Sequence, residues 1–253
     1  MTSVRHAAAA LGIVFDRPLA YPQATALQEA LVAARLDDRI PDVVLFLEHP
    51  PVITLGMRAK AAHLLADPAT LAARGVAVER TSRGGDVTYH APGQLVVYPV
   101  LKLTGAEADT HRYVAQLEEA ALRTAADFGV AAFRRKGKTG VWTDRGKLAA
   151  IGVRVRRWVA FHGLSFNVDP DLAGFALIVP CGLHGEAVTS LREIMGRAGP
   201  SLKQVRERMA AHVAAATGRD LEMHTAGDAA LAESVRDMLA AAGLQAQAAE
   251  QAV

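Results

Sequence analysis

The chain contains a single cysteine, Cys181, and the residues around it suit thiol chemistry. It lies between Pro180 and Gly182, directly after the apolar run Phe175 to Val179. A lone free cysteine is usually a small buried hydrophobe. A Pro-Cys-Gly bend can instead present the sulfur at a surface, and the glycine leaves room for the oxyanion that forms when a thiolate attacks a carbonyl. We therefore interpret Cys181 as a candidate nucleophile.

A nucleophilic thiol needs a lowered pKa, which commonly comes from a nearby lysine, arginine or protonated histidine. Lys147, His162 and His184 are the candidates. Lys147 opens a run that is apolar until Arg154, where a solvated strand start is the ordinary interpretation. The functional one is a partly buried amine, because burial lowers the pKa of a lysine and lets it act as a base. Spacing along the chain leaves open whether Lys147 and Cys181 meet.

The stretch from Arg83 to Tyr98 is the candidate substrate-binding segment. It begins with Gly84 and Gly85, and then places polar side chains around a Pro-Gly turn: Thr88, Tyr89, His90 and Gln94. Glycine lets backbone N–H groups approach a ligand with no side chain in the way. A lone Gly-Gly is usually an ordinary turn, but the polar residues that follow it favour a binding surface.

Signatures of nucleotide and metal chemistry are missing. Gly137-Lys138-Thr139 resembles the end of a P-loop, but Ala132 stands where that motif requires glycine. No Gly-x-Gly-x-x-Gly occurs, so a dinucleotide cofactor on a Rossmann frame has no support. The scattered histidines match no metal-ligand spacing: His49, His90, His162 and His184. We expect no metal and no cofactor.

The composition bounds the class of protein. With 253 residues, 51% of them apolar, the chain is long enough for one domain with a substantial core. A net charge of +2 gives no reason to expect nucleic acid as a partner. One cysteine excludes an internal disulfide framework and fits a reducing compartment. No apolar run reaches about 18 residues, so no membrane span is expected, and the apolar start of the chain is interpreted as a first strand.

Periodicity predicts interspersed strands and helices around these residues. Strands are expected near residues 11–15, 43–47, 52–55, 76–81, 94–103, 140–143, 147–155 and 161–168, and helices near 22–34, 58–74 in pieces, 109–128, 190–195, 201–217 and 228–242. Several strands follow one another directly, which argues against a regular βαβ repeat. We predict an α+β (mixed α/β) single domain with a central mixed sheet flanked by helices.

Basic residues alternate with valines at the end of one expected strand. Arg154 and Arg156 share one face, and the valines share the other. A solvated strand face is the ordinary interpretation. The alternative is a docking patch that steers an acidic partner protein.

Several short motifs occur in a fixed order between about residues 20 and 215. They are Leu47-Glu-His-Pro50 with Thr54-Leu-Gly56; Arg83-Gly-Gly-Asp-Val-Thr-Tyr-His90 with Pro92-Gly-Gln94 and Tyr98-Pro99; Gly140-Val-Trp142; Lys147-Leu-Ala-Ala-Ile-Gly-Val-Arg154; Phe161-His-Gly-Leu164 with Asn167-Val168; and Pro180-Cys-Gly182 with Val188-Thr-Ser-Leu191. In this order they resemble the lipoyl(octanoyl) transferase family. One departure is Ala91, where the family's motif usually has glycine, and its methyl group puts the shape of this loop in question.

The resemblance implies a biotin/lipoate protein ligase-like fold and an acyltransferase. It implies transfer of an octanoyl group from octanoyl-acyl carrier protein to a lysine of lipoyl domains, those of 2-oxoacid dehydrogenases and of the glycine cleavage H protein, as the first step of protein lipoylation. Cys181 falls on the family's acyl-thioester nucleophile and Lys147 on the lysine that lowers its pKa. The substrate-binding segments fall on Arg83, Gly84, Gly85, Asp86, Val87, Thr88, Tyr89, His90, Ala150, Ile151, Gly152, Gly163, Leu164 and Ser165.

We also have expectations about the domain organisation, and several alternative functions stay open. We expect a cytoplasmic monomer with a catalytic domain over residues 1–218 and an alanine-rich helical extension, partly disordered, over 219–253. The closest rival is an ATP-dependent lipoate or biotin ligase on the same fold. A non-catalytic module that binds acyl carrier or lipoyl domains, and a cysteine hydrolase using His162 or His184, are further alternatives.

Overall fold

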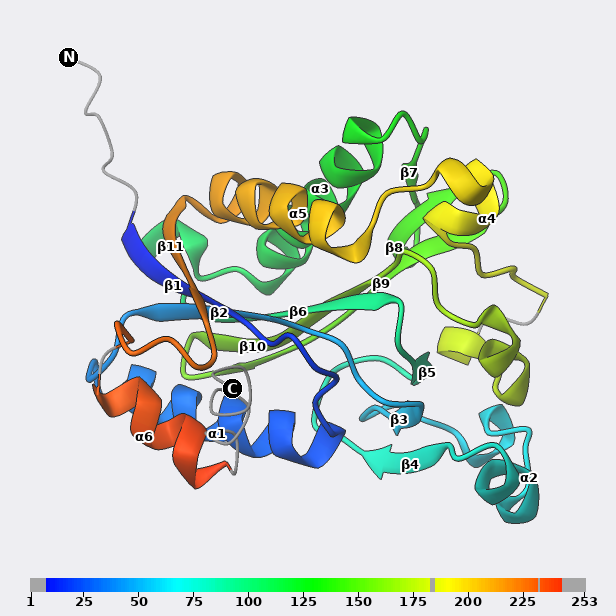
Figure 1. Cartoon of the computed structure of the whole chain (residues 1–253), viewed down its shortest axis with the longest axis horizontal. Helices are drawn as coiled ribbons and strands as arrows, with labels where there is room; N and C mark the ends of the chain where they lie inside the picture. The colour runs from blue at the N-terminus through cyan, green and yellow to red at the C-terminus, as the bar shows by residue number, and fades with distance from the viewer. Residues whose placement is uncertain (1–7, 183–184, 232, 243–253) are drawn as a thin grey trace, which may run out of the picture.

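An eight-stranded mixed sheet runs through the centre of the molecule (Figure 1). The computed structural model describes residues 8–182, 185–231 and 233–242. In spatial order the strands are β11 (Arg219–Thr225), β1 (Ala8–Val14), β2 (Asp42–Leu47), β6 (Gln94–Lys102), β10 (Val159–Asn167), β9 (Gly146–Arg156), β8 (Lys138–Thr143) and β7 (Phe133–Arg135). β1 pairs in parallel with β2 and β11, and the remaining pairs are antiparallel.

Helices cover both faces of this sheet. Helices α3 (Thr110–Asp127) and α5 (Leu202–Thr217) pack on one face, and α1 (Tyr21–Leu36) and α6 (Glu233–Ala241) pack on the other (Figure 1). The short α4 (Leu191–Met195) leads into α5. The predicted α+β class, with a central mixed sheet between helices, is confirmed.

The helices begin where the sequence supplies caps. Ser201 and Gln204 form a capping box at the start of α5, in which the Gln204 N–H donates to Ser201 Oγ and the Ser201 N–H donates to Gln204 Oε1. The carboxylate of Asp109 accepts from the first backbone N–H groups of α3. These caps satisfy N–H groups that have no partner within the helix.

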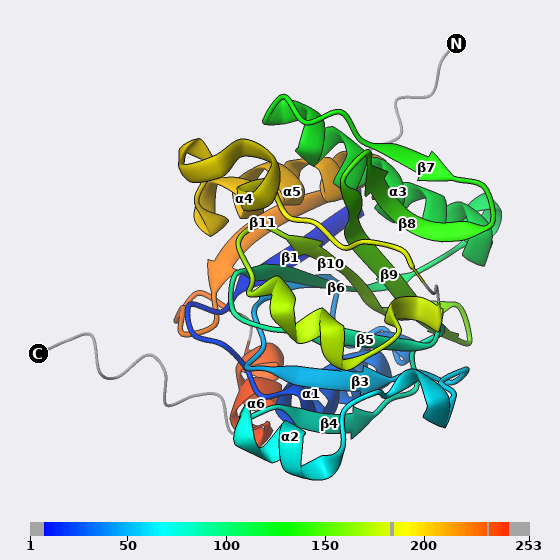
Figure 2. The ribbon, with the colours of Figure 1, turned by 90° about the vertical axis from the view of Figure 1, so that its right-hand side faces the viewer.

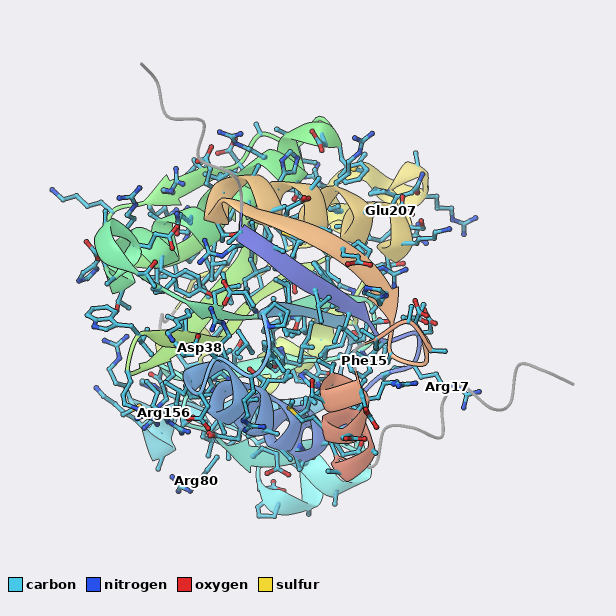
Figure 3. The ribbon with its side chains drawn as sticks, turned by 90° about the vertical axis from the view of Figure 1, so that its left-hand side faces the viewer. Phe15, Arg17, Asp38, Arg80, Arg156 and Glu207 are labelled. Carbon is cyan, nitrogen blue, oxygen red and sulfur yellow. The ribbon has the colours of Figure 1, made fainter. Side chains whose placement is uncertain are left out.

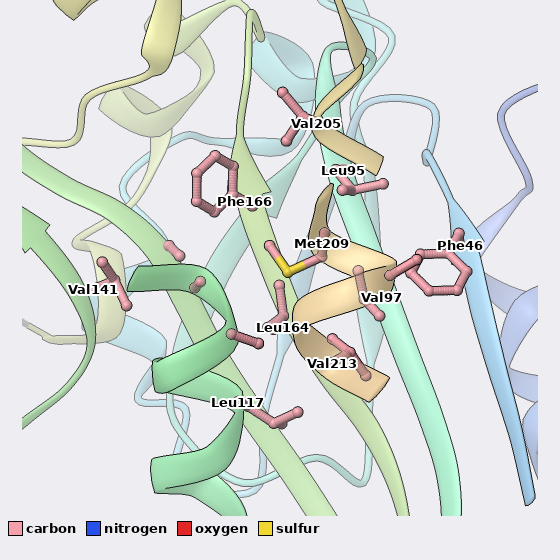
Figure 4. Packing of buried hydrophobic residues seen from close by; sticks show 14 of the residues in the cluster. Phe46, Leu95, Val97, Leu117, Val141, Leu164, Phe166, Val205, Met209 and Val213 are labelled. Carbon is pink, nitrogen blue, oxygen red and sulfur yellow. The ribbon is translucent and has the colours of Figure 1, made fainter. Parts of the chain in front are cut away.

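The larger core lies between the sheet and the α3–α5 pair. Figure 4 shows Leu117 of α3 and Met209 and Val213 of α5 packed against Val97 and Leu164 of the sheet. Each of these side chains is at most 2% exposed. Burying a side chain of this size contributes about 1.5–3 kcal/mol. The packing therefore fixes β6 and β10, whose other residues form the floor of the site described below.

A second, three-stranded sheet adjoins one end of the first. Its order is β4 (Ala77–Arg80), β3 (Val52–Leu55), β5 (Val87–His90), and α2 (Pro68–Ala73) lies beside it (Figure 2). A separate apolar cluster, which includes Ile53, Val87, Tyr89 and Ala91, supports this sheet. Single turns of 3₁₀ helix at Ala61–His63 and Pro180–Gly182 and a longer one at Leu172–Leu177 lie around it.

The sheet continues beyond residue 218. β11 pairs with β1 along its whole length, from Ala8 opposite Arg219 to Val14 opposite Thr225, and Figure 3 shows the two strands side by side at the edge. The domain boundary that we expect after residue 218 therefore lies between α5 and β11, and β11 is part of the central sheet. Helix α6 lies within the range 219–253 expected as an extension, and residues 243–253 lie outside the described part of the chain.

Candidate active site

A cavity of about 540 Å³ lies where the small sheet meets β9 and β10. Its walls come from segments far apart in the sequence: the loop 83–86, β5, the middle of β9 and β10, residues 137–139 at the start of β8, residues 58–63 and Gly182. β5 and the Pro180–Gly182 turn lie side by side in Figure 2. This volume is in the usual range for small-molecule sites.

Most of the residues implied as substrate-binding line this cavity. They are Arg83, Gly84, Gly85, Asp86, Thr88, His90, Ala150, Ile151, Gly152, Gly163, Leu164 and Ser165. Val87 and Tyr89 do not line it, because side chains alternate along β5 and these two point into the apolar cluster behind the strand. Ala91 is also buried in that cluster, and its φ lies outside the left-handed region. Its methyl group therefore fits without strain.

Lys147 reaches the cavity from the start of β9. It is 6% exposed, and its Nζ lies 5.3 Å from the centre of the Trp142 ring. A cation over an aromatic face is stabilised by the ring quadrupole. Gly140 makes room for the lysine stem, because a Cβ there would lie 2.6 Å from Lys147 Cε. Of the candidates for lowering the pKa of the thiol, Lys147 lines the cavity, His162 does not, and His184 lies outside the described residues.

The backbone that follows Cys181 is tied to this cavity. Gly182 lines it, and the segment that follows pairs with Lys147: the Lys147 N–H donates to Ala187 O at 2.8 Å, and the Thr189 N–H donates to Lys147 O at 3.0 Å. The side chain of Cys181 is outside the described part of the structure, so its meeting with Lys147 stays a prediction. The Gly182 N–H, a candidate oxyanion donor from the sequence, donates to Val179 O at 3.0 Å within the turn.

The Arg83 side chain fixes one wall of the cavity by hydrogen bonds to Thr54 and to the Gly84 carbonyl. Its Nη2 donates to Thr54 O at 2.7 Å and to Thr54 Oγ1 at 2.8 Å, and its Nη1 donates to Gly84 O at 3.0 Å. The Gly84 N–H donates to Val153 O at 2.9 Å. These bonds hold the glycine-rich loop between the small sheet and β9.

A chain of hydrogen bonds connects β5 to the segment beside Lys147. His90 Nδ1 donates to Gln94 Oε1 at 2.6 Å, Gln94 Nε2 donates to Asn167 Oδ1 at 2.8 Å, and Asn167 Nδ2 donates to Thr189 O at 2.9 Å. All three side chains are buried. Buried networks of this kind restrict their members to one geometry, so the floor of the cavity and the Lys147 backbone are positioned together.

The buried histidines of this region are held neutral. Burial lowers the pKa of His49 to about 4, and burial also lowers the pKa values of His90 and His162 to about 3. His162 has a positive φ of 56° within β10, and it contacts Ser82. Within the described ranges, no three His, Cys, Asp or Glu residues are grouped as a metal site would require.

Sequence reasoning missed His63, which lines the same cavity. It is 8% exposed, and its Nδ1 lies 2.5 Å from Asp86 Oδ2. No motif marks this residue, because the partner carboxylate is 23 positions further along the chain. The pairing of residues 64 and 178 brings His63 beside the Pro180 turn.

Solved structures show that this architecture is a known one. The bipartite lipoate protein ligase from Thermoplasma acidophilum superposes with a TM-score of 0.69 at 16% identity, covering 92% of this chain and 91% of that chain. A lipoate-protein ligase A bound with ATP gives a TM-score of 0.66, also at 16% identity, with 93% of both chains covered. These likenesses define the fold as that of lipoate protein ligases.

Closer relatives narrow the assignment. A curated octanoyltransferase from Chloroflexus aurantiacus is 52% identical over 198 residues, which cover 77% of this chain and 88% of the relative. One from Gloeobacter violaceus is 48% identical, covering 77% of this chain and 85% of the relative. The model of the lipoyl protein ligase A/B catalytic domain matches residues 20–214. The chain belongs to the lipoyl protein ligase A/B family.

No helix among the described residues is long and apolar enough to cross a membrane.

Proposed function

We propose that the chain is an octanoyltransferase that carries the acyl group as a thioester on Cys181. The observation that carries the proposal is the shared cavity: Lys147 and Gly182, the residue after Cys181, both line it, and residues 187–189 pair with Lys147. The names of relatives about half identical to this chain support the octanoyl group as the one transferred.

In the first half-reaction, the Cys181 thiolate attacks the thioester of octanoyl-acyl carrier protein. The bond from the carbonyl carbon to the carrier sulfur breaks, and a bond to Cys181 sulfur forms. One thioester replaces another, so the step needs no ATP. The Lys147 ammonium stabilises the thiolate before attack and then gives its proton to the leaving carrier thiolate.

In the second half-reaction, the amine of a lipoyl-domain lysine attacks the octanoyl-Cys181 thioester. An amide forms and Cys181 leaves, a step that is favourable because an amide is more stable than a thioester. Lys147, now neutral, accepts a proton as the amide forms. The acceptors are lipoyl domains of 2-oxoacid dehydrogenases and the glycine cleavage H protein, the donor is the carrier protein, and the enzyme acts as a cytoplasmic monomer.

Intact-mass measurement after mixing with octanoyl-carrier protein tests this mechanism. The wild type should gain one octanoyl group, and Cys181→Ser should gain none. Lys147→Ala should acylate about 100-fold more slowly, because the ammonium that stabilises the Cys181 thiolate and protonates the leaving carrier thiolate is lost. An unchanged adduct on Cys181→Ser would rule out the thioester mechanism.

The ligase alternative is tested in the same assay, because lipoate protein ligases share this fold. The mixture then contains octanoate, ATP and a lipoyl domain, with no carrier protein. The transferase mechanism predicts no acylated lipoyl domain. Robust product would favour a ligase that activates the free acid.

A further inference from the structure

We propose that His63, oriented by Asp86, is the base that takes the first proton from the acceptor lysine in the second half-reaction. The inference rests on the proposed function and adds a residue to its chemistry. It starts from a buried histidine–carboxylate pair in the cavity that the Cys181–Lys147 mechanism does not use.

The pair has the geometry of an oriented base. His63 Nδ1 donates to Asp86 Oδ2 at 2.5 Å, and Asp86 Oδ1 accepts from the Val87 N–H at 2.8 Å and the Lys60 N–H at 3.3 Å. With the proton on Nδ1, Nε2 is the basic nitrogen of the neutral ring. The hydrogen bond to the carboxylate also fixes the orientation of the ring.

The pair lies directly against the nucleophile turn. A Cβ added to Gly182 would be 2.6 Å from Asp86 Oδ2 and 2.9 Å from His63 Cε1. The Val179 N–H donates to His63 O at 2.8 Å, which ties the 3₁₀ turn of His63 to the chain entering Pro180. The imidazole is therefore held next to the residue that follows Cys181, on a different segment from Lys147.

The acceptor lysine must lose two protons in the second half-reaction, and Lys147 accounts for only one of them. A lysine side chain of ordinary pKa, about 10.4, arrives at neutral pH as an ammonium. It must lose one proton before its nitrogen can attack and a second as the amide forms. Lys147 accepts the second, which replaces the proton given to the carrier thiolate. We assign the first to His63 Nε2, which passes it to solvent, so the step needs no further reagent.

The other histidines near the cavity are poorly suited to this task. Burial depresses the pKa values of His49, His90 and His162 to about 3–4, so these rings are weak bases. The charged groups that line the cavity with His63 are Arg58 and Lys60 beside its own turn, Arg83 and Asp86 in the loop, Lys138 on β8 and Lys147 on β9. Asp86 is the one anion in this group.

The test separates the two half-reactions. Octanoyl-enzyme is prepared from octanoyl-carrier protein, freed of carrier, and mixed with a lipoyl domain in single-turnover experiments between pH 6.5 and 9.5. For His63→Gln we expect acylation within threefold of wild type and transfer about 100-fold slower at pH 7. The deficit should shrink as pH rises, because more of the acceptor lysine is already unprotonated. Imidazole added to His63→Ala should restore part of the transfer rate.

Two further variants make the outcome decisive. Asp86→Asn keeps an acceptor for Nδ1 but removes the charge, and should slow transfer about tenfold with the same pH trend. His212→Gln removes the histidine of another pair, joined to Asp127 at 2.8 Å between α5 and α3, and should change neither step. Equal losses in both half-reactions for His63→Gln and Asp86→Asn, or a transfer deficit that stays constant with pH, would overturn the proposal. Failure of the wild type to form octanoyl-enzyme would instead overturn the proposed function.

Discussion

Three buried histidines make stability depend on pH at the scale of single residues. His49 donates from Nδ1 to Leu19 O at 2.6 Å and accepts from the Tyr98 hydroxyl at Nε2, a pattern that requires the neutral ring. His90 and His162 are likewise buried and neutral. Their folded-state pKa values lie well below the ordinary value of about 6.5, so the unfolded chain binds protons that the folded chain cannot.

We expect the free energy of unfolding to be largest above pH 6.5 and to fall as pH drops toward 4. Each histidine contributes up to about 1.4 kcal/mol per pH unit in this window, or about 2 kcal/mol between pH 7 and pH 5. Urea unfolding at pH 7, 6 and 5 measures the slope. His49→Gln should reduce the slope of the free energy of unfolding against pH by the contribution of one histidine. A variant slope equal to that of wild type would contradict this assignment.

At the scale of elements, β11 is held to the sheet edge by buried charges. Arg219 Nε donates to Asp42 Oδ2 at 2.7 Å, and the guanidinium also contacts Glu107 at 3.1 Å. Asp42 starts β2 and is shared with Arg35, whose Nε lies 2.6 Å from Oδ1. Asp42 and Arg219 are at most 7% exposed, so losing the arginine would leave a buried carboxylate with one cation fewer.

We expect Arg219→Ala to lower the free energy of unfolding by about 3 kcal/mol, the lower end for breaking a buried pair. Urea unfolding midpoints at constant m-value give the measurement. Arg123→Ala is the matched control, because its pair with Glu119 is exposed on α3 and should cost less than about 0.5 kcal/mol. Equal effects of the two substitutions would show that β11 contributes little to the fold.

Local features of the fold can be predicted from the sequence more readily than contacts between distant segments. The strand at 43–47 and the helix capped by Ser201 follow from apolar periodicity and cap chemistry, and both are confirmed. β11 was missed because it forms by pairing with β1, and these two strands lie far apart in the sequence, at residues 219–225 and 8–14. His63 was missed for the same reason, since its significance depends on Asp86 and Gly182 in space. Most residues of the glycine-rich motif line the cavity, while the pleat of β5 turns Val87 and Tyr89 away, and their role in substrate binding stays a prediction.

At the scale of the whole molecule, basic residues surround the approach to the cavity. Arg58 and Lys60 line it, and Arg154 follows Val153, another lining residue, along β9. Among the described residues, these three side chains take part in no ion pair. Arg156, on the same face of the strand and labelled in Figure 3, is instead paired with Glu29 at 2.7 Å. The charge available to an incoming acidic protein is therefore that of the three nearer the cavity.

We expect this charge to speed the encounter with an acidic carrier protein, as complementary potentials do when they steer association. Arg154→Glu should lower kcat/KM for octanoyl-carrier protein about tenfold at low salt, and the loss should shrink near 0.5 M salt because the Debye length falls below about 5 Å. Octanoyl-pantetheine, which lacks the carrier's surface, is the control donor and should show neither effect. A similar loss with octanoyl-pantetheine would mean that Arg154 acts on the cavity itself, and salt-independent kcat/KM with the carrier would mean that docking is not electrostatic.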